Sequence, residues 1–177
     1  MPLAPLRHLL GISLIAVAAT TLFAPLPSQA VAVGDQAPDI TAIQADGTPI
    51  QLSALRGKTV YLDFWASWCG PCRQSFPWMN AMHDKYGGSG LAIVAVNVDK
   101  KRADAEKFLA QFPARFTIVY DEQGATPLKY AVRKMPTSML IDARGRIVNE
   151  HSGFCNESRE ELESRIRAAM AARPPAN

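Results

Sequence analysis

Hydrophobic and polar positions along the chain follow the periods of strands and helices in turn. Residues 59–65 and 91–98 are almost continuously apolar, which predicts two central strands buried on both faces of a sheet. Residues 72–86 and 158–173 carry apolar side chains at helical spacing, so we expect amphipathic helices there. Weaker or shorter elements are predicted as strands at 116–120, 138–142 and 147–150 and as helices at 103–112 and 125–132.

A β-hairpin is predicted before the first long strand. Short apolar runs at 40–45 and 50–52 flank the segment 46–49, whose Asp-Gly pair favours a tight turn. Residues 31–38 are expected to form an exposed lead-in to this hairpin. The complete order is a hairpin, then βαβα with an inserted βα element at 116–132, then ββα. This order predicts an α/β fold with a central mixed parallel and antiparallel sheet and helices on both faces.

The first 30 residues have the features of a secretory signal. Arg7 precedes an apolar run at 9–23, and Ser28-Gln29-Ala30 forms a small-x-small cleavage pattern. The apolar run is short for a membrane span, which needs about 20 residues. We therefore predict a signal peptide at 1–30 and an exported domain at 31–177. An uncleaved segment that anchors the protein to the membrane is the alternative.

Composition and charge exclude several classes of function. The formal net charge of +3 is too balanced to indicate binding to nucleic acid or to an acidic membrane. The chain has three cysteines, so its exported domain depends on a hydrophobic core rather than on a disulfide framework. A zinc site would need four ligands, and beyond the cysteines the chain has only the scattered His8, His83 and His151. We expect no metal site and no cofactor.

The pair Cys69 and Cys72 carries the chemistry that the sequence indicates. Cys-x-x-Cys between a buried strand and a helix is typical of a dithiol redox site. The unpaired N–H groups and the positive dipole end of the helix start favour a thiolate. We expect Cys69 to be an exposed nucleophile and Cys72, one turn deeper, to be the resolving thiol. A purely structural bridge is the alternative, although so small a ring constrains the unfolded chain only weakly.

Two features near the cysteines refine this interpretation. Gly70 and Pro71 add no charge between the cysteines, so we expect a reducing dithiol rather than a strong oxidant. Asp63 is an acid within an otherwise apolar strand, where burial should raise its pKa. It could take the proton from Cys72 when that thiol attacks. The alternatives are a structural acid with a hydrogen-bond partner and an edge position that faces water.

Residues 60–72 resemble the active-site strand and turn of thioredoxin. Pro77 matches the kinking proline of that family's helix, and Met135-Pro136-Thr137 matches its cis-proline loop. By itself the sequence favours a trans bond before Pro136, since about one X-Pro bond in twenty is cis. The resemblance instead implies a cis Pro136 that lies against the cysteine pair, with the backbone of Met135 offered to an extended substrate peptide. The expected substrate surface comprises Trp68, Gly70, Pro71, Met135 and Thr137.

The exported N-terminus, the hairpin and the inserted βα element resemble the TlpA/ResA/CcmG-type thiol–disulfide oxidoreductases of the bacterial envelope. Residues 33–39 and 136–142 fit that subgroup. The resemblance implies a monomeric reductase of disulfides in exported proteins, recharged by a membrane thiol transporter of the DsbD or CcdA type.

The chain departs from this subgroup in several places. Many members carry an acid three residues after the second cysteine, where this chain has Ser75, and lack the acid that it has at Asp63. The exchange supports a proton role for Asp63. Ala95 replaces a lysine often found near the buried acid of thioredoxin. Residues 132–137 lack the Gly-Val-x-Gly-x-Pro-Glu loop of CcmG, which weakens a role in cytochrome c biogenesis.

Other functions of the same fold remain as alternatives. The thiolates of Cys69 and Cys72 could hold Cu(I) in a copper chaperone or act as a copper-site thiol reductase. A thioredoxin-fold peroxidase would need a Pro-x-x-x-Thr-x-x-Cys pattern, which is missing, and two intact cysteines argue against a pure binding module. Cys155 lies outside the family pattern. We expect it to be a partly buried, inert thiol, with an intermolecular disulfide or a third exchange step as the alternative.

Overall fold

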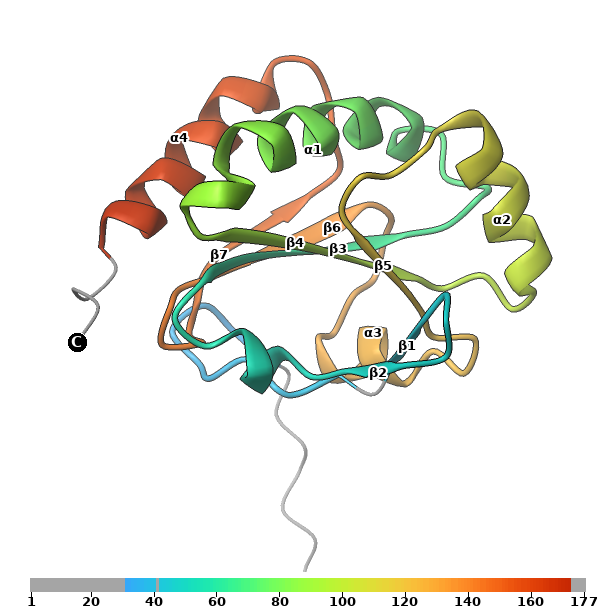
Figure 1. Cartoon of the computed structure of the whole chain (residues 1–177), viewed down its shortest axis with the longest axis horizontal. Coiled ribbons are helices and arrows are strands. Elements are labelled where there is room, and N and C mark those ends of the chain that lie inside the picture. Colours follow the sequence, from blue (N-terminus) through green and yellow to red (C-terminus); the bar gives the residue numbers. More distant parts are fainter. Residues whose placement is uncertain (1–30, 41, 173–177) are drawn as a thin grey trace, which may run out of the picture.

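A seven-stranded mixed sheet forms the centre of the computed structural model, which describes residues 31–40 and 42–172 (Figure 1). The strand order is β2-β1-β5-β4-β3-β6-β7, with β3, β4 and β5 parallel and β6 antiparallel to β3. The strands are β1 (Ala42–Gln44), β2 (Pro49–Ile50), β3 (Thr59–Trp65), β4 (Leu91–Asn97), β5 (Thr117–Tyr120), β6 (Thr137–Ile141) and β7 (Ile147–Ser152). The helices are η1 (Leu52–Leu55), α1 (Cys72–Tyr86), η2 (Gly87–Ser89), α2 (Arg102–Gln111), α3 (Ala125–Lys129) and α4 (Ser158–Ala171).

The predicted mixed α/β sheet of the thioredoxin type is confirmed, including its N-terminal hairpin and inserted βα element. In the hairpin, Ala42 pairs with Ile50 across the antiparallel strands β1 and β2. The inserted element is β5 followed by α3, and β5 joins the hairpin to the parallel core of the sheet. The predicted signal peptide lies outside the described residues. Within the described part of the chain, no helix is long and apolar enough to cross a membrane.

Two hydrophobic cores lie on opposite faces of the sheet, because alternate side chains of β3 point in opposite directions. Leu62 and Phe64 belong to the core on the face covered by η1 and α3. Tyr61 and Trp65 belong to the core formed with α1, α2 and α4; in Figure 1, α1 and α4 lie above the sheet and α2 lies at its right side. All seven residues of β3 are buried, as its continuous apolar run predicts. Asp63 therefore faces the same core as the two cysteines.

The N-terminal lead-in is exposed at residues 32–36, as predicted, and its pairing with another segment is the feature that the prediction lacked. Its backbone follows the turn between β6 and β7, where the Gly34 N–H donates to the Ile147 carbonyl at 2.8 Å and the Ala37 N–H donates to the Gly145 carbonyl at 2.8 Å. The side chain of Ala37 is buried. Hydrophobicity could not predict this pairing, because it is made by main-chain N–H and C=O groups.

The active-site loop leaves the sheet at the end of β3. This strand ends at Trp65, and the chain turns through Ser67 and Cys69 before α1 begins at Cys72.

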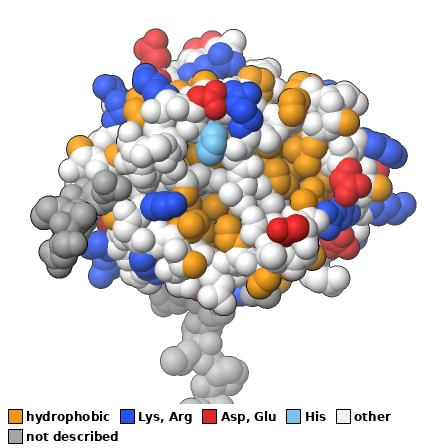
Figure 2. All heavy atoms as spheres, in the orientation of Figure 1, with side chains coloured by type: hydrophobic (Ala, Val, Ile, Leu, Met, Phe, Trp, Pro, Cys, Tyr) orange, Lys and Arg blue, Asp and Glu red, His pale blue; other side chains and the backbone are white. Residues whose placement is uncertain are grey.

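Hydrophobic side chains also reach the molecular surface. On the face drawn in Figure 2 they gather near the middle, between charged side chains. Trp68, the residue before Cys69, is 68% exposed, which is unusual for a large aromatic side chain.

Candidate active site

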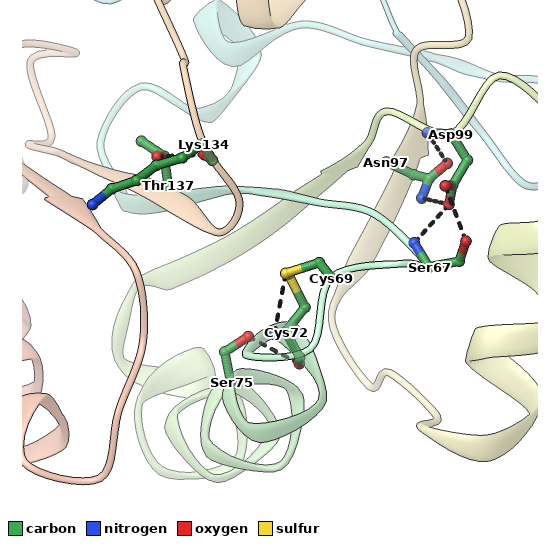
Figure 3. The surroundings of a disulfide bond; sticks show 8 residues. All are labelled: Ser67, Cys69, Cys72, Ser75, Asn97, Asp99, Lys134 and Thr137. Atoms are coloured by element: carbon green, nitrogen blue, oxygen red, sulfur yellow. Dashed lines mark hydrogen bonds between the residues drawn. A yellow bond between two sulfur atoms is a disulfide. The ribbon is translucent and has the colours of Figure 1, made fainter.

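A disulfide joins Cys69 to Cys72 at the start of α1, with 5.4 Å between the two Cα atoms (Figure 3). The predicted redox pair is therefore bonded. Pro71 is the N-cap residue of α1, and the Arg73 N–H donates to the Gly70 carbonyl at 3.1 Å, so the chain is already turning between the cysteines. The Cys72 N–H donates to the Cys69 sulfur at 3.3 Å. After reduction, the same N–H can stabilise negative charge on that sulfur.

The burial of the two cysteines corrects one prediction. Cys72 is fully buried, as expected for the deeper thiol. Cys69, however, is only 3% exposed in this oxidised state, so the prediction of an exposed nucleophile is wrong for it. Cys69 belongs to the core under α1, and Met135 packs against that core. The members of this core are distant from one another in sequence, so the position of Cys69 beside a helix start could not reveal its burial.

Asp63 lies in the middle of β3 with neighbours that cannot neutralise it. Its register partners are Ala95 on β4 and Ser138 on β6. The side chain is 2% exposed, and its Oδ2 atom is buried without a hydrogen-bond partner. Of the three interpretations that the sequence allows, the edge position facing water is thus excluded.

Burial raises the pKa of Asp63 well above its ordinary value. The neighbouring Tyr61 hydroxyl donates to Ser138 Oγ at 2.9 Å rather than to the carboxyl group. Burial, followed by the charge of Asp63, raises the pKa of Tyr61 as well. An acid with a raised pKa beneath a reactive pair is suited to proton transfer near neutral pH.

Pro136 is the last residue of the loop before β6. The Met135–Pro136 peptide bond is cis, as the thioredoxin resemblance implies and contrary to the preference read from the dipeptide alone. The Pro136 side chain is buried, and its carbonyl accepts a hydrogen bond from the Gly153 N–H at 2.8 Å. Met135 is partly buried and packs against both cores.

The predicted substrate contact of Thr137 needs correction. Thr137 is 1% exposed and pairs with Phe64 on one side and with Ser152 on the other. Its hydroxyl donates to the Lys134 carbonyl at 2.8 Å and lies 3.1 Å from Ser152 Oγ. The side chain therefore holds the loop in place from inside the protein (Figure 3). Trp68, Gly70 and Pro71 are exposed, so they remain candidates for the substrate surface.

A carboxylate from the neighbouring strand holds the active-site loop. Asp99 follows β4, and its Oδ2 and Oδ1 atoms accept hydrogen bonds from the Ser67 N–H at 2.9 Å and the Ser67 hydroxyl at 3.0 Å. Asn97 donates to Asp99 Oδ2 at 2.8 Å and accepts from the Asp99 N–H at 3.1 Å (Figure 3). Asp99 is 5% exposed, so these contacts are shielded from water.

The third cysteine also differs from its prediction. Cys155 is a free, exposed thiol rather than a partly buried one. Its backbone is held by Ser158, whose hydroxyl donates to the Cys155 carbonyl at 2.8 Å at the start of α4. The neighbouring Phe154 is buried in the core under α1, so Cys155 is exposed directly beside a core residue.

Comparison with known proteins agrees with this site. The model of the Redoxin family matches residues 32–166, which include the sheet, both cysteines and the cis-proline loop. This chain belongs to the Redoxin family.

Among Redoxin relatives, the thiol-disulfide oxidoreductase ResA of Geobacillus thermodenitrificans is 35% identical over 163 residues, covering 90% of this chain and 94% of ResA. A Chlorobium tepidum structure provisionally assigned as the thiol:disulfide interchange protein DsbE is 52% identical, with a TM-score of 0.77, covering 80% of this chain and 99% of that one. A thiol:disulfide interchange protein from Bacteroides sp. is 26% identical, with a TM-score of 0.67 and coverage of 77% and 91%. These relatives and the bonded cysteine pair identify this Redoxin protein as a thiol–disulfide oxidoreductase.

Sequence reasoning missed the residues that brace the Redoxin active-site loop. Asn97 ends the otherwise apolar strand β4 and Asp99 lies two residues beyond it, and this polar ending was an available signal. Neighbouring parallel strands end at the same edge of a sheet, so polar groups after β4 lie beside the end of β3. Their contact with Ser67 depends on the register of Trp65 opposite Asn97, which only the structure defines.

Proposed function

We propose that this protein is a reductase of the bacterial envelope that reduces disulfides in exported proteins by dithiol–disulfide exchange. The observation that carries the proposal is the Cys69–Cys72 disulfide at the start of α1, with the Cys72 N–H directed at the Cys69 sulfur. That arrangement supports Cys69 as the attacking sulfur, because a thiolate there gains a hydrogen bond and the helix dipole. Gly70 and Pro71 add no charge, which supports a reducing pair.

The reaction transfers two electrons from the dithiol to the substrate. The Cys69 thiolate attacks one sulfur of the substrate disulfide, forms a mixed disulfide and releases the other substrate sulfur as a thiolate. Cys72 then loses its proton and attacks the Cys69 sulfur. The second substrate sulfur leaves, and the Cys69–Cys72 disulfide forms. Each cycle consumes one reduced dithiol, so a donor of thiol electrons must reduce the pair again.

Asp63 accepts the proton of Cys72 in the second step. Three features support this role: its position on the cysteine-bearing face of the sheet, its unpartnered Oδ2 and its raised pKa. An ordinary aspartate would be too weak a base for a thiol, whereas a raised pKa brings base and thiol closer in proton affinity.

The substrate surface is formed by the exposed segment around Cys69 and by the cis-proline loop. Trp68 offers an apolar face, and Gly70 and Pro71 let a peptide approach the sulfur closely. The cis-proline loop supplies the rest of this surface, where the backbone of Met135 can pair with an extended peptide.

The predicted signal peptide at 1–30 supports export and an extracytoplasmic location. The partners are then disulfide-containing exported proteins and a membrane thiol transporter of the DsbD or CcdA type, with the protein acting as a monomer. No nucleic acid takes part.

Trapping the mixed disulfide tests this proposal. Cys72→Ser removes the resolving thiol, so substrates should stay linked to Cys69 when the full chain is expressed in a bacterial host and exported to its envelope. Cys69→Ser is the matched control, because it keeps Cys72 and Cys155. Exported proteins linked through Cys69 alone support the reductase, and their identity separates cytochrome apoproteins, copper-site proteins and a broad mixture. Equal captures by the two variants, or tight Cu(I) binding without captured disulfide partners, would contradict it.

A further inference from the structure

We propose that a groove between α1 and α2 selects substrates that carry a carboxylate side chain near the disulfide to be reduced. The inference rests on the proposed reductase function and names a substrate class for it. The groove begins at the active-site loop, so an occupant would be part of the same polypeptide that reacts with Cys69.

The groove consists of two adjoining hollows. The first has a volume of about 210 Å³ and is lined by Ser67, Arg73 and residues of α2. The second has a volume of about 240 Å³ and runs on along α1 towards Arg115. Gln111 and Phe112 line both hollows, so the two hollows adjoin at these residues.

Positive charge predominates at the end of the groove nearest the cysteines. Arg73 is exposed and follows Cys72 directly, and it forms no ion pair with any other residue in the described ranges. Lys107 lies across the hollow, where its amine is 3.8 Å from Asp104 in an exposed pair. The hollow thus has two cations, Arg73 and Lys107, and one carboxylate, Asp104. The exposed ion pair between Lys107 and Asp104 is weak. A second carboxylate is the complementary ligand.

The floor of the groove suits the apolar part of such a segment. The Phe108 ring lies 4.9 Å from the Phe112 ring, measured between centroids, and Phe112 is only partly buried. An aliphatic stem ending in a carboxylate can lie on these rings and reach Arg73 or Lys107. A glutamate side chain has this shape.

The position of Ser67 links the groove to the reaction. Ser67 lines the hollow and lies two residues before Cys69, while Asp99 holds it in place. A substrate joined to the Cys69 sulfur would therefore have flanking residues within reach of the groove. Binding there would raise the rate for acidic substrates without a change in the chemistry.

Peptide disulfides test the inference. A neutral peptide with one disulfide serves as the parent, and a set of peptides replaces one Gln by Glu at each position beside its cysteines. We expect at least one Glu peptide to have a kcat/KM about two- to fivefold above its Gln parent, as for an exposed charge pair. The preference should shrink at about 1 M salt.

The matched variants locate the effect. Arg73→Gln combined with Lys107→Gln should bring the Glu-to-Gln ratio close to one, whereas Arg144→Gln, an exposed cation in the β6–β7 turn, should leave the ratio unchanged. A ratio of one at every position in the wild type, or a preference that survives in the double variant, overturns the groove. Failure of the wild type to reduce even the neutral parent overturns the reductase function instead, so the two failures are distinct.

Discussion

Asp99 accepts two hydrogen bonds from Ser67, one from its N–H at 2.9 Å and one from its hydroxyl at 3.0 Å. This contact connects the end of β4 to the loop that presents Cys69. The Cys69 N–H in turn donates to the Ala66 carbonyl at 3.1 Å, so Ser67 lies within a closed turn. The position of the reactive sulfur therefore depends on a carboxylate thirty-two residues away from Ser67.

Replacing this carboxylate should disturb both stability and reactivity. Asp99→Asn keeps the size of the side chain, but its NH₂ group cannot accept one of the two Ser67 hydrogen bonds. We expect the free energy of unfolding in urea to fall by about 1–3 kcal/mol and the rate at which reduced Cys69 attacks a disulfide to fall as well. Glu122→Gln, at an exposed carboxylate, is the control and should change neither quantity. Wild-type values for both quantities in Asp99→Asn would show that the contact is dispensable.

Asp63 should make the folded protein less stable as pH rises, the opposite of the effect of most carboxyl groups. Burial raises its pKa in the folded protein, so the folded state holds the proton more tightly than the unfolded chain does. This contribution to stability is complete below the unfolded pKa of about 4 and is lost as pH rises through the folded pKa. Asp63→Asn should remove that loss and stabilise the oxidised protein at pH 8 by about 1–3 kcal/mol. The measurement is urea unfolding of both proteins from pH 4 to 8, and parallel curves would contradict a raised pKa.

The same substitution should slow the release of bound substrate. An amide cannot accept the proton of Cys72, so the second exchange step loses its base. In single-turnover experiments with a preformed mixed disulfide on Cys69, we expect Asp63→Asn to slow release at least about tenfold at pH 7. Formation of the mixed disulfide should change less, because it does not require deprotonation of Cys72. Equal release rates in the two proteins would remove the proton role and leave Asp63 as a structural acid.

Trp68 should affect recognition and not stability. Its side chain is 68% exposed, so Trp68→Ala should change the free energy of unfolding by less than about 0.5 kcal/mol. For a folded protein substrate, kcat/KM should fall several-fold more than for a small disulfide, which cannot reach the indole ring. An equal loss for both substrates would place the effect at the cysteines rather than on the substrate surface.

Much of the site could be predicted from local sequence, because its signals are local. The spacing of Cys69 and Cys72 and the acid at Asp63 within an apolar strand each identify a position without knowledge of the fold. Contacts between distant segments could not be predicted in this way. Three features depend on how separate loops pack at the same end of the strands. They are the burial of Cys69, the hydrogen bond of the Thr137 hydroxyl inside the protein and the support of Ser67 by Asp99.

The central claim is that reduced Cys69 is an activated thiolate, and the chain contains its own reference thiol. Cys155 is exposed and not bonded to another cysteine, so its alkylation can be compared with that of Cys69 in the same molecule. In reduced, folded Cys72→Ser protein, the iodoacetamide alkylation rates of Cys69 and Cys155 can be followed together by mass spectrometry from pH 5 to 9. We predict that Cys69 reacts faster than Cys155 near pH 7. The midpoint of the rate increase with pH should lie about one pH unit or more lower for Cys69 than for Cys155. A midpoint for Cys69 at the same pH as that of Cys155, or at a higher pH, would contradict the account.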